Sequence, residues 1–324
     1  MKKLIFIAFT LVTLACLAQA QDETTIKHKF LAVDFWKGKI HFVDQNDPSK
    51  NWSEPWGGGL RDLQLIGNNQ LLVSEHNGWK IYDLLTRKMI SQIKLDGISG
   101  ISTLRRLPDG RTFIGTNQKI DGKEGVTICE LDAANNLVRK VTFPQFRWLR
   151  LMRPTLAGTW LLTEWDGAVE VTIADNIADD KRVLNQFKLP RPRNAYMALR
   201  KPDGNTLVAG GYAAGLFEYT PDGKLLRELV AKQPEGMQNH FYAALQIMPN
   251  GHVIQANWNG HSDKDYKPGW KLIEFDQDGK VVWTWNEPPE KIGTINGLLV
   301  LDGIDTSVYN DDISGLLAPV AIKK

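Results

Sequence analysis

The run HVIQANW, residues 252–258, follows the turn MPNG and ends on a large aromatic side chain. Five other stretches have the same form, so the chain holds six copies of one short apolar segment. The others are FLAVDFW (30–36), QLLVSEH (70–76), TFIGTNQ (112–118), TWLLTEW (159–165) and TLVAGGY (206–212). The final residues of the copies are separated by 40, 42, 47, 47 and 46 positions. The copies therefore indicate a repeated structural unit.

Each repeat contains further strands. An apolar segment precedes every copy except the first, and turns such as PDG and PNG favour an antiparallel reversal between the two. A third strand follows each copy, and then a more polar fourth, as in WKIYDLL and MISQIKL. Four strands in each of six units, at a period of roughly 40 to 50 residues, predict an all-β, six-bladed β-propeller. The alternatives, a β-sandwich or two smaller β-domains, give no reason for a run repeated at this period.

The two ends of the chain complement each other. The first copy, at 30–36, has no apolar strand before it, whereas GTINGLLVLDG (293–303) has the form of such a strand and no blade after it. We therefore expect 293–303 to complete the blade of 30–56 as its inner strand, which leaves no open sheet edge. Residues 21–324 would then be one propeller domain, with 304–324 as a tail on its surface.

The first twenty residues, MKKLIFIAFTLVTLACLAQA, have the pattern of a secretory signal peptide. Without Lys2 and Lys3 the count of Lys and Arg falls from 39 to 37, which equals the 37 Asp and Glu. We expect a soluble monomer, periplasmic or secreted, without a transmembrane segment and without a basic surface for nucleic acid. Lipid anchoring at Cys16 is the alternative form of export. Only Cys129 would remain, so no internal disulfide is expected.

Blade geometry predicts where the ligand binds. The second strand of a blade ends on the face where the inner strand begins, so side chains from all six blades should meet at one channel mouth. Aromatic, Arg, His and Asn side chains there suit a neutral or mildly anionic ligand with planar or sugar-like faces. The predicted ligand-binding residues are Trp36, His76, Trp165, Tyr212, Trp258, Arg61, Asn194, Asn257 and Asn296. The predicted catalytic residues are His240, Arg147 and Glu164.

Aromatic side chains at such positions can also be wedges that pack neighbouring blades. Trp165 and Trp258 are the better ligand candidates, because polar residues flank both in TEWDG and ANWNG. Trp283 and Trp285 lie two positions apart on an outer strand and are expected to be packing residues. Among the histidines, His76 follows Glu75, which could orient its ring for proton transfer.

The remaining histidines carry less signal. His28, His41 and His252 lie on or beside strands and indicate no function. The loop NGHSDKDYKPG, residues 259–269, matches no zinc or calcium signature, so no metal is predicted.

The segment LIEFDQDGKVVWTWN (272–286) and its weaker echo LFEYTPDGKLLREL (216–229) resemble the repeats of quinoprotein-like and arylsulfotransferase-like propellers. The resemblance covers the blade scaffold over most of the chain. It implies a channel-facing histidine assisted by arginine, roles that His240 and Arg147 would take. The vicinal disulfide and acidic cation site of quinone-dependent dehydrogenases have no counterpart here, and no cofactor is expected.

These observations leave three functions open. The first is an exported propeller that binds, or binds and cleaves, a carbohydrate or similar polar metabolite. As an enzyme it would be a lyase or hydrolase, with His240 as acid or base and Arg147 neutralising a carboxylate. The second is a non-catalytic scaffold or protein-binding propeller. The third is an arylsulfotransferase-like transferase.

Overall fold

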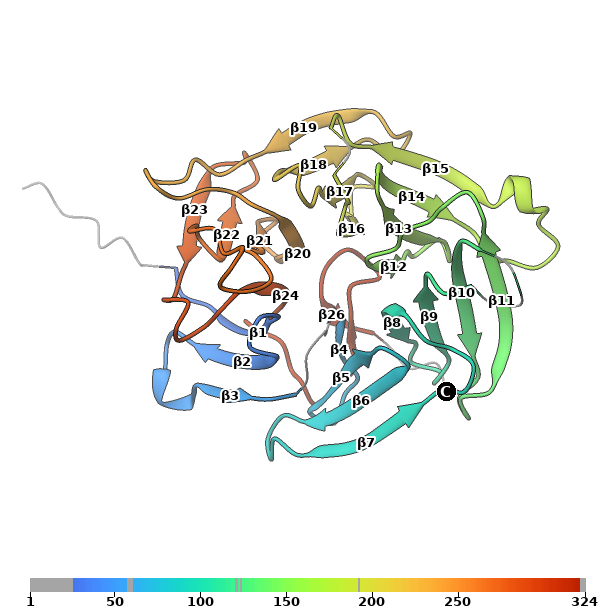
Figure 1. The fold of residues 1–324 in the computed structure, drawn as a ribbon, viewed down its shortest axis with the longest axis horizontal. Coiled ribbons are helices and arrows are strands. Elements are labelled where there is room, and N and C mark those ends of the chain that lie inside the picture. The colour runs from blue at the N-terminus through green and yellow to red at the C-terminus, as the bar shows by residue number, and fades with distance from the viewer. Residues whose placement is uncertain (1–25, 57–60, 120–121, 123, 192, 321–324) are drawn as a thin grey trace, which may run out of the picture.

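The computed structural model describes residues 26–56, 61–119, 122, 124–191 and 193–320. The predicted signal peptide, with Cys16, lies outside these ranges. The described chain forms six four-stranded antiparallel sheets around one axis, which confirms the predicted six-bladed β-propeller (Figure 1). None of the helices in these ranges has the length and apolar character needed to span a bilayer.

Each blade runs from an inner strand outward. Blade 1 contains β24 (Ile295–Val300), β1 (Lys29–Asp34), β2 (Lys39–Asp44) and β3 (Trp52–Glu54). Blade 2 contains β4 (Leu63–Leu65), β5 (Gln70–Glu75), β6 (Gly78–Asp83) and β7 (Met89–Lys94). Blade 3 contains β8 (Ile101–Arg106), β9 (Thr112–Thr116), β10 (Val126–Leu131) and β11 (Leu137–Phe143).

The second half of the ring repeats this order. Blade 4 contains β12 (Met152–Pro154), β13 (Trp160–Glu164), β14 (Gly167–Val171) and β15 (Val183–Lys188). Blade 5 contains β16 (Met197–Arg200), β17 (Thr206–Ala209), β18 (Leu216–Tyr219) and β19 (Leu225–Leu229). Blade 6 contains β20 (Tyr242–Ile247), β21 (Val253–Asn257), β22 (Leu272–Phe275) and β23 (Val281–Trp285). Two short 3-10 helices, η1 (Pro48–Lys50) and η2 (Asp179–Lys181), lie in loops, and β25 (Asn310–Asp311) pairs with β26 (Ala318–Pro319).

The predicted turns have the backbone that their residues favour. In the PDG turns of blade 5, Gly204 has φ of 89° and Gly223 has φ of 86°. Side chains on L residues rarely allow this left-handed region, whereas glycine adopts it without strain. These turns link consecutive antiparallel strands and so fix the strand register of each repeat.

Blade 1 closes the ring as predicted. Its inner strand β24 pairs with β1 in antiparallel register, with Phe30 opposite Val300 and Leu31 opposite Leu299. A buried ionic cluster beside this seam joins the ends of the ring. The ring nitrogens of His28 lie 2.5 Å from Asp302 Oδ2 and 3.0 Å from Glu274 Oε2. The first and last strands and blade 6 are thereby held together.

The hydrophobic core lies between neighbouring blades. Trp283 and Trp285 are buried, as expected for packing residues, and both rings meet Phe30 edge to face across the boundary between blades 6 and 1. Between blades 3 and 4, Trp160 is buried against Phe113 with the two rings tilted at 42°. Large aromatic side chains therefore fill the wedges between blades, where burial of apolar area is greatest.

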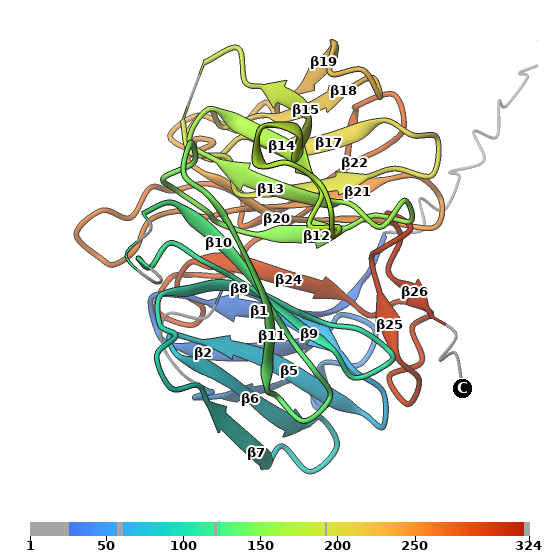
Figure 2. The same ribbon diagram turned by 90° about the vertical axis from the view of Figure 1, so that its right-hand side faces the viewer.

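The C-terminal segment differs from the expected surface tail. Residues 309–317, here called the strap, cross the end of the channel where the inner strands finish, and Figure 2 shows β25 and β26 beside the end of β24. Bridges join Tyr309 to Ile66 after β4 and Leu316 to Ile247 at the end of β20. The strap is therefore part of the packed molecule.

Buried charges explain why the strap lies there. Arg153 Nε donates to Asp312 Oδ2 at 2.9 Å, and Gln64 Nε2 donates to Asp311 Oδ2 at 2.6 Å. The side chains of Arg105 and Arg153 lie in the channel and need acidic partners once they are removed from water. The strap supplies one of these partners from a distant part of the sequence.

Candidate functional site

The channel mouth lies at the end of the axis opposite the strap, where second strands end and inner strands begin. Backbone hydrogen bonds join these segments across blade boundaries. Asn194 N donates to Trp165 O at 2.8 Å, and Tyr242 N donates to Gly211 O at 3.0 Å. Ile101 N donates to His76 O at 3.0 Å in the same way. The two sets of predicted site residues therefore lie on one face.

Two arginines without acidic partners define the chemistry of this mouth. Arg150 is 8% exposed, its Nε donates to Asn194 Oδ1 at 3.2 Å, and its guanidinium lies 5.1 Å from the centre of the Trp148 ring. Burial lowers its pKa to about 10, and the positive charge of Arg61 adds to this effect. Arg150 therefore stays charged at neutral pH. Among the described residues no carboxylate forms an ion pair with either.

The predicted catalytic residue Arg147 lies outside this pair, and Arg150 from the same loop lies in it. The side chain of Arg147 is exposed, and no hydrogen bond or ion pair joins it to the described residues of the mouth. Arg150 immediately precedes Leu151, the residue before β12, and so enters the channel. The sequence signal that identifies Arg150 is its position just ahead of the inner strand β12. Arg147 lies three residues before Arg150.

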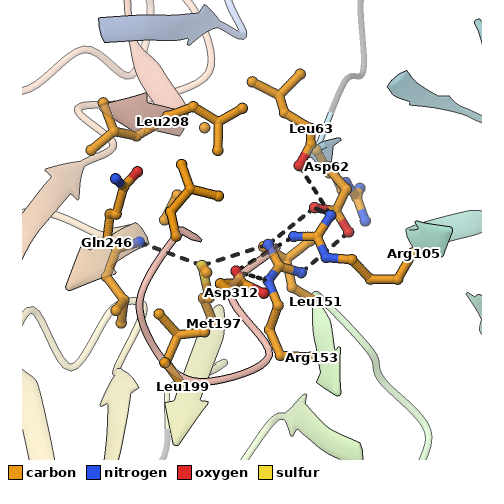
Figure 3. Close-up of a pocket in the computed structure, with 17 residues that line it drawn as sticks. Asp62, Leu63, Arg105, Leu151, Arg153, Met197, Leu199, Gln246, Leu298 and Asp312 are labelled. Atoms are coloured by element: carbon orange, nitrogen blue, oxygen red, sulfur yellow. Dashed lines mark hydrogen bonds and ion pairs between the residues drawn. The ribbon is translucent and has the colours of Figure 1, made fainter. Parts of the chain in front are cut away.

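The carboxylate nearest Arg61 in the sequence is already paired elsewhere. Asp62 is buried, and its Oδ1 lies 2.9 Å from Arg105 Nη1 and 3.0 Å from Arg153 Nη2 (Figure 3). Burial alone would raise the pKa of Asp62, but these two guanidinium groups lower it below its usual value. Its negative charge is therefore matched by arginines deeper in the channel.

A small cavity lies in the channel below the mouth. Leu151, Leu199 and Leu298 from three blades, together with Asp312 of the strap, line a cavity of about 20 Å³ (Figure 3). That volume is enough for about one water molecule. This cavity is therefore too small for a metabolite.

A tyrosine and an asparagine lie next to the arginine pair. Tyr196 is buried, and Asn296 Nδ2 donates to its hydroxyl oxygen at 3.2 Å. Burial raises the pKa of Tyr196, although the charges of Arg61 and Arg150 oppose that rise. The phenol therefore stays protonated at neutral pH. One cluster thus contains the predicted residues Arg61, Asn194 and Asn296. It also contains Tyr196 and Arg150, which the sequence does not predict.

His240 lies beside this cluster. Its ring meets Tyr212 edge to face, with centroids 5.5 Å apart. Tyr212 in turn lies close enough to Arg150 to raise the pKa of that arginine. Burial lowers the pKa of His240, and the positive charge of Lys267 lowers it further, so the imidazole is neutral at pH 7. Within the described part of the chain, no side-chain hydrogen bond or ion pair occupies its ring nitrogens. A neutral imidazole with a free nitrogen is able to accept a proton.

Two other predicted ligand contacts are structural. Trp258 is 2% exposed and packs against Tyr196, Phe241 and Phe35 as a wedge. Asn257 is fully buried, and its Oδ1 accepts hydrogen bonds from the backbone N of His240 at 2.8 Å and of Phe241 at 3.2 Å. Asn257 therefore fixes the loop that carries His240 and has no surface for a ligand.

Trp165 and Tyr212 offer exposed aromatic faces at the mouth. They are 50% and 43% exposed, and Trp148, on the loop before β12, is exposed beside Arg150. Glu164 precedes Trp165, and burial together with the charge of Asp166 raises its pKa. The aromatic faces can cover an apolar or sugar-like ligand body while the arginines hold an anionic group.

No hydrogen bond, ion pair or ring contact within the described ranges joins Trp36 or His76 to this cluster. Trp36 is half-buried and faces Tyr266 at a centroid distance of 6.3 Å. His76 is exposed on blade 2, and the neighbouring Glu75 binds Lys80 Nζ at 2.5 Å and Gln92 Nε2 at 2.7 Å. Glu75 is therefore engaged elsewhere and does not orient the His76 ring. Across the described ranges no group of three or more His, Cys, Asp or Glu side chains is arranged to hold a metal ion.

Comparison with known proteins supports the fold. No protein-family model and no curated protein sequence matches the chain. A solved structure of a protein of unknown function from Bacteroides caccae is similar at 22% identity with a TM-score of 0.63, over 84% of this chain and 98% of that one. At this identity the likeness shows the fold alone.

Two lyase structures share the same architecture. A streptogramin B lyase is similar at 14% identity and a TM-score of 0.53, over 84% of this chain and 90% of its own. A catalytically inactive histidine-to-alanine variant of virginiamycin B lyase from Staphylococcus aureus, solved with quinupristin, has 10% identity and a TM-score of 0.53. That match covers 81% of this chain and 85% of the lyase.

Proposed function

We propose that this propeller binds a small carboxylate-bearing metabolite, of the uronic acid type, at the channel mouth. The observation that carries the proposal is the Arg61 and Arg150 pair, because neither guanidinium has an acidic partner among the described residues and Asp62 is paired elsewhere. Uncompensated charge in a partly buried site is costly, and an anionic ligand removes that cost. Guanidinium groups also match the planar geometry of a carboxylate.

The body of the ligand lies against the exposed aromatic faces. Trp148, Trp165 and Tyr212 flank the arginine pair, and sugar rings present apolar C–H faces that stack on aromatic side chains. This arrangement supports the carbohydrate-type ligand over the other two candidates. A protein-binding scaffold does not require a half-buried charged pair, and no second histidine at an inner-strand start supports a sulfotransferase.

Calorimetric titration of the purified protein tests this assignment. Galacturonate should bind, and galactose, which lacks the carboxylate, should bind at least about tenfold more weakly, since a charge-assisted hydrogen bond contributes about 1.5–3 kcal/mol. R150A and R61A should each reduce the affinity for galacturonate by a similar factor. R147A, an exposed arginine from the same loop, is the matched control and should bind normally. Equal affinity for both sugars, or unchanged affinity in R150A, would refute the proposal.

Catalysis by His240 is the second candidate, favoured by its neutral and unoccupied imidazole. The ring would remove the proton from the carbon next to the carboxylate while the arginines neutralise the growing negative charge. The carbon electron pair then forms a double bond as the neighbouring C–O bond breaks, and the leaving oxygen takes up a proton. The two lyases with this fold act as a precedent for the reaction class only.

The pH dependence of turnover distinguishes catalysis from binding. The pKa of His240 lies below 6.5, and a general base works in its unprotonated form, so the rate should fall as pH drops through that lower value. H240A should bind galacturonate with nearly normal affinity and release no unsaturated product. The ultraviolet absorbance of a polygalacturonate solution measures that product. Absence of any product from the unaltered protein would leave recognition as the function.

Export is part of the same proposal and rests on the sequence of residues 1–20 alone. N-terminal sequencing of protein recovered from the medium or periplasm should begin at Gln21. Protein retained in the cytoplasm with Met1 intact would exclude export.

A further inference from the structure

Blade 1 carries a second set of reactive side chains far in sequence from the proposed catalytic His240. Asp34 ends β1, His41 lies on β2, and Ser53 lies directly opposite His41 on β3. His41 Nδ1 is 2.5 Å from Ser53 Oγ, and His41 Nε2 is 3.2 Å from Asp34 Oδ2. We infer that Ser53, His41 and Asp34 form a nucleophilic serine site that accepts acyl groups from carboxylic esters. This site is independent of the function proposed for the channel mouth.

Asp34 holds the histidine in the form that such a site requires. Its carboxylate is fully buried and accepts backbone hydrogen bonds from Gly293 at 2.6 Å and from Thr294 and Lys37 at 3.1 Å. Burial would raise the pKa of Asp34, but the hydrogen bonds from His41 and these three amides lower it. An ionised carboxylate only accepts hydrogen bonds, so the His41 proton lies on Nε2.

The fixed tautomer leaves His41 Nδ1 as a proton acceptor towards Ser53. The histidine ring is itself buried, whereas the serine is exposed and so can be reached from solvent. An acid, a histidine and a serine in these mutual roles are recognised by geometry, whatever their order in the chain. The order here, Asp34 then His41 then Ser53, reflects three consecutive strands of one sheet.

The serine opens onto a groove that can hold a small acyl group. The groove has a volume of about 270 Å³ and lies between blade 1 and the loop after β23. Val43 and Ile292 supply apolar side chains to its lining, whereas the rings of Phe42 and Trp52 stack 5.5 Å apart on the opposite face of the sheet. Asn51 also lines it, and so do Lys291 and Glu287, which form an ion pair at 3.0 Å.

The expected reaction is the hydrolysis of an ester in two steps. Ser53 Oγ bonds to the carbonyl carbon while its proton passes to His41 Nδ1, and that proton then leaves with the alcohol as the ester C–O bond breaks. Water next bonds to the acyl carbon of Ser53 as His41 takes one of its protons. The acid departs, and the proton returns to Ser53 Oγ. One ester and one water give one acid and one alcohol.

A purely structural role for the same hydrogen bonds is the competing explanation. β3 has only three residues, and the contact between Ser53 and His41 also fastens it to β2. A substitution at either residue therefore changes stability under both explanations. The decisive measurement is the chemical reactivity of the serine, which fastening alone does not raise.

Labelling with a fluorophosphonate probe provides that measurement. The purified protein should react at one residue, identified as Ser53 by peptide mass spectrometry, and S53A should remain unlabelled. H41Q keeps a hydrogen-bonding side chain but no base, and its labelling rate should fall at least about a hundredfold. S91A is the matched control, since Ser91 lies on the outer strand of blade 2 opposite Ile81, and its labelling should be normal.

Circular dichroism melting of each variant shows whether it is folded when labelled. If S53A or H41Q does not fold, S53C provides the same test, because a cysteine beside His41 should react with iodoacetamide at pH 6 at least about tenfold faster than S91C. Absence of labelling in the folded, unaltered protein would overturn the inference. Labelling that persists in S53A, or equal alkylation of S53C and S91C, would overturn it as well.

Discussion

Trp165 and Trp258 end equivalent strands in blades 4 and 6 and have similar polar neighbours, yet their surroundings differ. Trp258 is enclosed by the rings of Phe35, Tyr196 and Phe241, whereas Trp165 projects from its turn with half of its surface exposed. The difference arises from residues on adjacent blades. One tryptophan therefore stabilises the fold, and the other is free to contact a ligand.

This contrast predicts opposite results for two alanine substitutions. W258A removes a buried indole and should lower the free energy of unfolding by about 3–5 kcal/mol, as expected for loss of a large core side chain. W165A should change it by less than about 0.5 kcal/mol and weaken galacturonate binding. Urea unfolding and calorimetry measure the two effects. Equal destabilisation by both variants would contradict the assignment of Trp258 as a wedge.

Individual residues also show where sequence reasoning failed. Arg147 and Arg150 are separated by three positions in FRWLR, and the period of the repeats could not decide which one enters the channel. His41 lies on a strand without a local signal of function, and its relation to Ser53 depends on the register between β2 and β3. The local sequence pattern predicts neither the twist of a blade nor the register of its outer strands.

At the scale of elements, the seam of blade 1 depends on the ionic cluster around His28. Burial alone would lower the pKa of His28, but hydrogen bonds and charge from Asp302 and Glu274 raise it to about 9. A pKa raised on folding adds stability that is complete below about pH 6.5 and is lost as pH rises through about 9. The cluster thus strengthens the closure most under neutral and acidic conditions.

Replacing this histidine should reveal that dependence. H28Q should lower the free energy of unfolding by about 1.5–3 kcal/mol at pH 6, the range for a hydrogen bond to a charged group. At pH 10 the unaltered protein has also lost the charge, so the two proteins should differ much less. Thermal melts at both pH values provide the measurement. A difference that stays constant between pH 6 and pH 10 would contradict the charged cluster.

The strap carries a carboxyl group whose contribution to stability is also lost as pH rises, but over a lower range of pH. Burial and the neighbouring Asp312 raise the pKa of Asp311 to about 7, while Arg105 and Arg153 oppose the rise. The hydroxyl of Tyr309 also faces this carboxyl, at 3.2 Å. A carboxyl group whose pKa is raised on folding stabilises the folded protein at low pH, where the group is protonated. The resulting stability is lost as pH rises from about 3.8 to about 7.

D311N should remove this loss, because an amide does not ionise. Its stability relative to the unaltered protein should therefore increase between pH 4 and pH 8. D312N is the matched control, since it removes an ion pair to Arg153 and should be destabilising at pH 8. Melting temperatures of the three proteins at both pH values test the prediction. A constant difference between D311N and the unaltered protein would show that Asp311 does not titrate in this range.

Across the whole molecule, the fold was predictable because its signals are local and repeated. The apolar runs, the glycine turns and the unmatched strands at the two ends identified six blades and the closing strand β24. The strap was not predictable in this way. Its position depends on Asp312 meeting arginines of blades 3 and 4 and on Asp311 meeting Gln64, and that long-range pairing has no periodic pattern.

The candidate site was predictable in its location and only partly in its members. Arg61, Asn194, Asn296, Tyr212 and His240 lie in the sector identified from blade geometry. Arg150 and Tyr196, which the sequence did not single out, complete their contacts. The ring brings together residues from blades 1, 2, 4, 5 and 6. The positive charges of Arg61 and Arg150 repel each other as a result.

A crystal structure of the protein soaked with para-iodobenzoate tests the central claim most directly. This ligand joins a carboxylate to a planar ring, and its iodine is located without ambiguity by anomalous scattering. We predict that the carboxylate lies between the Arg61 and Arg150 guanidinium groups, with the iodinated ring against Trp148 or Trp165. An empty channel mouth in a crystal that binds the ligand elsewhere would contradict the account.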